Sequence, residues 1–303
     1  MSAARLILGA HMSISGGFDK AIERGHELGC QCVQLFTKNN NQWKANGLSR
    51  ADRLAFDQAK ERCRIEYVIA HASYLINLAS PDESLWKKSL DAFVLELRRA
   101  EHLGIPYLVL HPGAYTSSSE RAGLRRVARA LNETHRRTRR LKAKCLLENT
   151  AGQGTCLGHR FEHLAAILAQ VKAPERLGIC FDTCHAFSAG YPLQTREGYA
   201  DTMRQLDDLV GLEHVKAIHL NDSKRPLGSR VDRHEHIGRG FMGAKSFTCL
   251  LSDARVNGIP MYLETPKGEH PETRKPWDTI NLRKVRRLAG SARSRSRRSP
   301  AQR

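Results

Sequence analysis

The chain alternates between short apolar runs and longer stretches in which apolar and polar residues recur at helical spacing. The short runs have three to five residues and fall at 6–10, 32–36, 67–70, 107–110, 145–147, 177–181, 215–218 and 261–263. Runs of this length, bounded by turn-forming residues, predict buried strands. The intervening stretches predict helices at 18–28, 49–64, 80–103, 119–140, 160–171, 199–210, 245–251 and 277–288.

The order of these elements predicts the fold class. Strands that alternate with helices favour a parallel sheet covered by helices. Eight strand–helix units in a chain of 303 residues match a closed barrel, for which about 250 residues is usual. We therefore expect an α/β fold, a (β/α)8 TIM barrel, that forms a single domain over residues 1–289.

The predicted strands share an unusual way of ending. From the third strand to the eighth, each is closed by a residue that can bind a metal: His71, His111, Glu148, Asp182, His219 and Glu264. One such residue after a strand is more often a turn former or a helix cap. Six in succession are different, because the C-terminal ends of barrel strands meet at one mouth, where the active sites of these folds lie.

Two loops add further ligand types. His185 follows Asp182 by three residues, and the long loop after the seventh strand holds Asp232 and His234. An Asp-x-His spacing lets both side chains face the same way on an extended segment. With these three, the set has nine members, which suits two or three ions, because a single zinc usually takes three or four protein ligands. The mixture of imidazoles and carboxylates predicts a catalytic zinc cluster, with manganese as an alternative in part.

Charge narrows the class of substrate. The formal net charge is +18, which predicts attraction to polyanions, nucleic acid first. Five arginines fall in residues 290–303, a Ser/Arg-rich segment with little to bury, which we expect to be a disordered basic tail. The remaining body is basic in its own right. Clustered divalent ions suit in-line displacement at phosphorus, so a nucleic-acid phosphodiester is the natural substrate.

The remaining composition bears on location. The eight cysteines are scattered without a paired zinc pattern, and no apolar run approaches the roughly 20 residues that span a membrane. The apolar run near the start is too short for a signal peptide and is interpreted as the first strand. We expect a reduced, cytoplasmic protein, nucleoid-associated if bacterial, that does not bind membranes.

Two other classes of function fit part of this pattern. A metal-dependent sugar isomerase or epimerase of the xylose-isomerase-like barrel class also uses His and acidic ligands at a barrel mouth. It usually needs fewer ligands and has no use for a strongly basic body. A non-catalytic nucleic-acid binder has no need of the complete ligand set.

Several longer motifs resemble a known family, endonuclease IV, the zinc-dependent apurinic/apyrimidinic (AP) endonucleases of base excision repair. The resemblance covers about residues 5–288. It is carried by GAHMS at 9–13, FTKN at 36–39, HASYLINL at 71–78, HPG at 111–113, LENTAGQG at 147–154, FDTCHAF at 181–187, HLNDSK at 219–224, GSRVDRHEHIG at 228–238 and LETP at 263–266.

The resemblance implies a trinuclear zinc site with every ligand position filled. One zinc would be held by His71, His111 and Glu148, which would bridge to a second held with Asp182, His219 and Glu264. The third would be held by His185, Asp232 and His234. The implied reaction is hydrolysis of the phosphodiester 5′ to an abasic site, leaving a 3′ hydroxyl and a 5′ deoxyribose phosphate, with trimming of blocked 3′ ends. Glu148 and Glu264 are the catalytic candidates, Glu264 for orienting the nucleophile.

The resemblance also implies how abasic duplex DNA would be recognised. An unstacked abasic nucleotide costs less to flip out than a normal one. The family inserts loop side chains into the duplex, and Tyr74 and Leu75 occupy the matching positions. Some members have an Arg where this chain has Asn41, so Lys38 or Lys44 is expected to supply the positive charge. A monomer is the default expectation.

Overall fold

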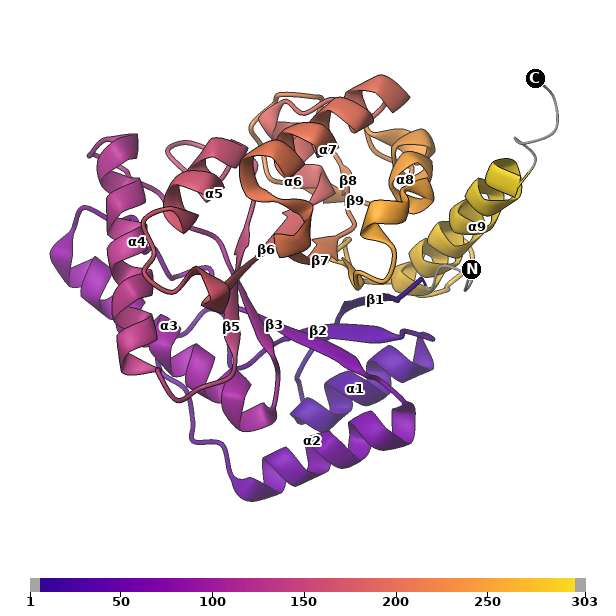
Figure 1. Ribbon diagram of the computed structural model, residues 1–303. Coiled ribbons are helices and arrows are strands. Elements are labelled where there is room, and N and C mark those ends of the chain that lie inside the picture. Colours follow the sequence, from indigo (N-terminus) through magenta and orange to yellow (C-terminus); the bar gives the residue numbers. More distant parts are fainter. Residues whose placement is uncertain (1–5, 298–303) are drawn as a thin grey trace.

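Eight parallel strands close into a barrel in this computed structural model, which describes residues 6–297, with side chains described as far as Ser291 (Figure 1). Around the barrel the strand order is β1-β10-β7-β6-β5-β4-β3-β2. The strands are β1 (Leu8–His11), β2 (Cys32–Phe36), β3 (Tyr67–His71), β4 (Tyr107–Leu110), β5 (Lys144–Glu148), β6 (Leu177–Asp182), β7 (Val215–His219) and β10 (Met261–Leu263). The predicted fold class is confirmed.

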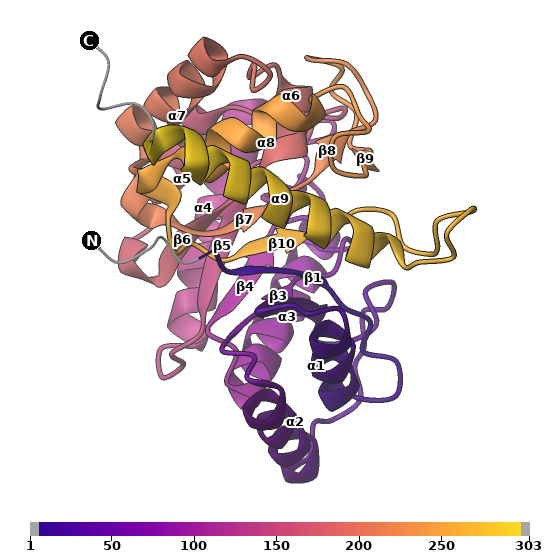
Figure 2. The same cartoon turned by 90° about the vertical axis from the view of Figure 1, so that its right-hand side faces the viewer.

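Helices surround the barrel on the outside (Figure 1). They are α1 (Phe18–Glu27), α2 (Arg50–Cys63), α3 (Glu83–Leu103), α4 (Glu120–Arg137), α5 (Phe161–Leu168), α6 (Thr183–Ala189), α7 (Arg196–Val210), α8 (Gly243–Ser252) and α9 (Trp277–Arg297). The last of these runs along the outside of the barrel next to α8 and covers β1 (Figure 2). Its Leu282 and Val285 are fully buried there.

An apolar layer of side chains fills the barrel interior. The strand positions of this layer also show which polar residues point inward. The layer contains Ile7, Cys32, Ile69, Val109, Leu146, Cys180, Ala217 and Tyr262. Side chains two positions apart face the same way on a strand. The residues two positions further along are therefore also directed inward, above the apolar layer: Gln34, His71, His111, Glu148, Asp182, His219 and Glu264.

Some predicted boundaries are wrong, for local reasons. The sequence predicted a helix that begins at residue 80, but α3 begins at Glu83 and Asp82 is its N-cap, accepting a hydrogen bond from the Leu85 N–H at 2.7 Å. Ser80 instead accepts one from the Asp82 N–H, so it supports the turn before the cap. The short helix α6 and the small hairpin of β8 (Asp222–Ser223) and β9 (His234–Glu235) were not predicted.

The C-terminal segment also differs from expectation. The helix α9 continues past Gly290, where we expected a disordered tail to begin, and ends at Arg297. Ala and Arg have high intrinsic helix propensity, and Pro300 is the first residue after Trp277 that strongly opposes a helix. Residues 298–303 lie outside the described part. None of the described helices is long and apolar enough to cross a membrane.

Candidate metal centre

The nine predicted ligands lie together at the mouth of the barrel. Six come from the ends of β3 to β7 and β10, and three from the segments that follow β6 and β7. Six of them line a cavity of about 330 Å³, whose lining also includes Tyr74 and Arg233. The sequence prediction that these positions converge on one mouth is therefore met by the geometry.

Glu148 is the hub of the centre. Its side chain is inaccessible to solvent, and each carboxylate oxygen faces two imidazoles. His71 Nε2 and His111 Nε2 lie 3.2 and 3.1 Å from Oε2, and His185 Nδ1 and His219 Nδ1 lie 3.1 and 2.9 Å from Oε1. A single buried carboxylate thus joins both halves of the cluster.

The other carboxylates extend the cluster in two directions. Glu264 Oε2 lies 3.2 Å from His219 Nδ1. On the other side, Asp232 lies 3.2 Å from His185 Nε2 and 3.4 Å from His234 Nε2. The ligand atoms of His71, His111 and Glu148 lie within 4.8 Å of one another, and so do those of His185, Asp232 and His234.

The tautomers of the histidines indicate that a cation belongs between these groups. His71 and His185 each place Nδ1 next to a backbone oxygen, Ala72 O at 2.7 Å and Asn149 O at 2.9 Å. Nδ1 must carry a proton to donate there, so the lone pair of a neutral ring is on Nε2, on the side of the carboxylates. His234 is held in the same way by Glu264 O at 3.1 Å. In metal sites, the second ring nitrogen of a ligand histidine donates in this manner.

Two of these inward nitrogens are buried without any hydrogen-bond partner, His185 Nε2 and His234 Nε2. Buried polar atoms are nearly always satisfied, so each needs an explanation. Both face Asp232 at distances typical of two ligands that share an ion. The donor set therefore fits divalent metal ions, and its nitrogen and oxygen chemistry suits zinc or manganese.

The electrostatics of the site agree with this interpretation. Burial opposes ionisation of Glu148, yet the neighbouring His219 and His111 outweigh it and hold the Glu148 pKa well below its usual range. Burial similarly opposes charge on His185, but the Asp182 and Asp232 carboxylates raise the pKa of that imidazole well above its ordinary value. Glu148 is thus ionised at neutral pH, and both shifts show that positive charge is favoured at the mouth.

Three buried amides that we did not predict hold the ligands in place. Gln34 receives the His219 Nε2 proton at 2.7 Å and donates to Glu264 at 2.5 Å. Asn221 donates to Asp182 Oδ2 at 2.7 Å, and Asn149 accepts from the Asp182 N–H at 2.7 Å. Gln34 carried a signal in the sequence, because it is a polar residue within an otherwise apolar strand.

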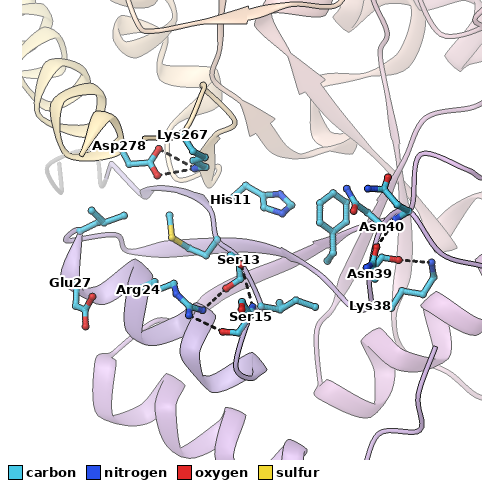
Figure 3. A pocket seen from close by; sticks show the side chains of 15 residues that line it. His11, Ser13, Ser15, Arg24, Glu27, Lys38, Asn39, Asn40, Lys267 and Asp278 are labelled. Carbon is cyan, nitrogen blue, oxygen red and sulfur yellow. Dashed lines mark hydrogen bonds and ion pairs between the residues drawn. The ribbon is translucent and has the colours of Figure 1, made fainter. Parts of the chain in front are cut away.

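The predicted DNA-contacting residues have mixed outcomes. Tyr74 is 60 % exposed and stands over the site, its ring 5.5 Å from that of His71 and 5.7 Å from that of Phe36. Leu75 beside it is half-buried. Asn41 is exposed and lines a larger cavity of about 780 Å³. Its lining also includes His11, which points into it from β1 (Figure 3).

The structure contradicts a direct DNA contact by Lys38. Its side chain is 3 % exposed and its ammonium lies 3.3 Å from the buried carboxylate of Glu96. His236 is also buried and stacks on Trp277 with ring centroids 3.7 Å apart. Both side chains turn inward because a buried partner is available.

A second histidine cluster lies apart from this centre. Glu120, His159 and His163 bring ligand atoms within 4.8 Å of one another. However, the Gly158 N–H donates to His163 Nδ1, and His163 Nε2 lies 3.1 Å from both Glu120 and Arg160 Nε, so both ring nitrogens already have protein partners. Arg160 also donates to Glu120. We interpret this group as a hydrogen-bonded ion-pair cluster.

Comparison with known proteins places the chain among relatives of similar length. The family model described as "Xylose isomerase-like TIM barrel" matches residues 22–285. A protein of Chloroflexus aurantiacus named "Probable endonuclease 4" is 50 % identical over 284 residues, 94 % of this chain and 98 % of the relative. A Geobacter sulfurreducens protein with the same name is 45 % identical over 293 residues, 97 % of this chain and 98 % of the relative.

Solved structures agree. Endonuclease IV from Thermus thermophilus superposes with a TM-score of 0.82 at 36 % identity, covering 94 % of this chain and 99 % of that one. A D-tagatose 3-epimerase-like protein superposes with a TM-score of 0.69 at 18 % identity, covering 95 % of this chain and 99 % of that one, which shows a shared fold alone. With the barrel, the residues at its mouth and these relatives taken together, the chain belongs to the endonuclease IV family.

Proposed function

We propose that this protein repairs DNA by hydrolysing the phosphodiester 5′ to an abasic site in duplex DNA, and that it also trims blocked 3′ ends. Membership of the endonuclease IV family makes it a DNA-repair endonuclease. The observation that carries the finer assignment is the set of inward imidazole nitrogens that face carboxylates across the barrel mouth.

We assign three zinc ions to the nine residues. The first is held by His71, His111 and Glu148, the second by Glu148, Asp182, His219 and Glu264, and the third by His185, Asp232 and His234. Such ions, when bound, supply an activated water and stabilise the charge that develops on the phosphoryl and leaving oxygens.

The residues of the chain itself do the positioning. Gln34 and Asn221 hold the two oxygens of Glu264, so this carboxylate is fixed at the mouth where it can orient the attacking water. Four imidazoles around Glu148 keep it negatively charged although burial opposes the charge. Arg233 lines the cavity and brings a guanidinium near the position of the target phosphate.

The preference for an abasic site over an intact duplex can be explained by side chains of the loop after β3. Tyr74 projects from the loop after β3, directly over the cavity, and its exposed ring can stack in the gap left by a missing base. We assign Tyr74 and Leu75 as the wedge that enters the duplex, with Asn41 at its edge. Flipping an abasic nucleotide out of the duplex costs less free energy than flipping a normal one, so insertion of the wedge favours abasic sites.

The test is incision of a duplex oligonucleotide with one abasic site, beside an intact duplex. Protein is assayed as purified, after prolonged strong chelation, and after addition of zinc or manganese. We expect incision of the abasic strand alone, lost after chelation and restored by zinc, with three zinc ions bound per chain by elemental analysis. Failure to incise by a protein that still holds several ions would contradict the proposal and favour a sugar isomerase.

A further inference from the structure

The loop after β2 and the loop after β3, which carries Tyr74, are joined beneath the surface by one buried carboxylate. Glu96 projects from α3 on the outside of the barrel and is 1 % exposed. Its carboxylate lies 3.3 Å from the Lys38 ammonium, which belongs to the loop after β2. It also accepts a hydrogen bond at 3.1 Å from the N–H of Ser73, in the loop after β3. One carboxylate therefore contacts both loops.

Each loop is then held internally. Lys38 donates to the backbone oxygen of Asn39 at 3.2 Å (Figure 3). It also donates to the backbone oxygen of Gln42, so its ammonium links the two ends of this loop segment. Ser73 Oγ donates to Asn40 O across the gap between the loops and accepts from the Leu75 N–H at 3.3 Å. The residue between Ser73 and Leu75 is Tyr74, so the position of its backbone depends on this network.

None of these groups belongs to the metal centre or reaches the mouth. Lys38 and Glu96 are both nearly inaccessible, so neither can contact a DNA phosphate in this arrangement. Surface ion pairs contribute little and are easily replaced, whereas breaking a buried pair leaves an uncompensated charge. A buried pair at the junction of two loops fixes their relative geometry.

We propose that Glu96 is a positioning residue for abasic-site recognition, holding the Tyr74 wedge in place through Ser73 on one side and Lys38 on the other. This inference rests on the proposed wedge function of Tyr74. It assigns recognition to a side chain on an outer helix that contacts neither metal nor DNA. The buried position of Lys38 is then explained by positioning, in place of the electrostatic contact expected from the sequence.

The test compares Glu96→Gln with the intact protein, both loaded with metal. The amide keeps the size of the side chain but loses the charge that pairs with Lys38. We expect the KM for abasic duplex to rise about tenfold, as for loss of a hydrogen bond to a charged group, with kcat unchanged. Hydrolysis of bis(p-nitrophenyl) phosphate, which needs the metal centre but no wedge, should stay at the level of the intact protein.

A second measurement reports on the loop directly. Amide hydrogen exchange of the peptide that covers residues 72–78 should be faster in Glu96→Gln, whereas a peptide from β4 should exchange as before. Lys38→Met added to Glu96→Gln removes the unpaired buried charge and should recover part of the loss in KM. Asp91→Asn is the matched control, since it removes the carboxylate that pairs with Arg137 at 2.7 Å from the same helix.

The outcomes separate the two proposals. Equal loss on abasic duplex and on the small diester, with a lowered Tm, would mean that Glu96 only stabilises the fold and would overturn the inference. Unchanged KM and exchange in Glu96→Gln, with Tyr74→Ala impaired, would overturn it and leave the wedge intact. If Tyr74→Ala also behaved as the intact protein, the wedge would fail and the inference with it.

Discussion

At the scale of single residues, the chemistry of the site follows from which ring nitrogen carries a proton. One ring N–H of His71, His185 and His234 is taken by a backbone oxygen, and one of His219 by the Gln34 amide, so the lone pair of the other ring nitrogen is directed to the mouth. Replacing a ligand carboxylate by the corresponding amide would disturb the site, because the carboxylate oxygens face defined imidazole nitrogens. These contacts give the barrel mouth an arrangement of nitrogen and oxygen atoms that fits cations.

At this scale, the preference for abasic DNA can be tested at Tyr74. Its ring is exposed and supported by Phe36 and His71, so replacement removes a stacking surface without opening the core. Tyr74→Ala should weaken binding of abasic duplex by about 1–3 kcal/mol, the range for a base–aromatic stack, and binding of intact duplex by less. Fluorescence anisotropy titrations with both duplexes measure this.

The control for this variant is Leu54→Ala, which removes another exposed apolar side chain, from α2. It should leave both affinities unchanged. Equal losses of affinity for abasic and intact duplex in Tyr74→Ala would contradict the wedge role.

At the scale of elements, strand ends and loops have different tasks. The strands deliver ligands because inward positions alternate above a common apolar layer. The loops after β2 and β3, to which we assign DNA recognition, are both contacted from behind by α3.

The N-cap of α3 can be tested directly. Asp82→Ala removes the acceptor for the Leu85 N–H and should lower the free energy of unfolding by about 1 kcal/mol. Denaturant titration of metal-loaded protein measures the change. Ser84→Ala, an exposed position in the same turn, should have a much smaller effect. A result in which both variants match the intact protein would exclude Asp82 as a cap that contributes to stability.

At the scale of the whole molecule, charge is distributed unequally between mouth and exterior. The mouth gathers four carboxylates from a chain whose formal net charge is +18. Bound cations and a basic exterior would then make the whole face attractive to DNA, and the binding strongly dependent on salt. We propose that the C-terminal segment contributes to this nonspecific part alone.

Deletion of residues 290–303 tests that contribution. The cut falls after Ala289, the last residue described as buried, so the core remains complete. It removes five arginines. The slope of log K against log salt should become less steep by about 0.9 for each arginine that neutralises a phosphate. Zinc content and kcat at saturating substrate should not change, and an unchanged slope would contradict a role of the segment in binding DNA.

Local patterns in the sequence determined the order of the strands and helices and the residues at the strand ends. Apolar runs of strand length alternate with helical stretches, and a ligand-type residue closes six strands in succession, from His71 to Glu264. Period-two alternation and barrel closure are general consequences of chain geometry, so the fold class and the convergence of these side chains on one mouth could be predicted before any coordinates. Helix ends were less predictable, because Ser80 and Asp82 are both good caps and only backbone geometry selects between them.

Only the tertiary structure decided which polar side chains, distant in the chain, pair with one another. Nothing near Lys38 in sequence indicates that its ammonium is buried against Glu96, 58 positions away, rather than directed at DNA. The same holds for Gln34, whose partners are His219 and Glu264. Local patterns report which face of an element is buried, but not which partner meets a polar group there. That choice is made by packing, because a buried charge or amide is stable only where the fold brings it a complementary atom.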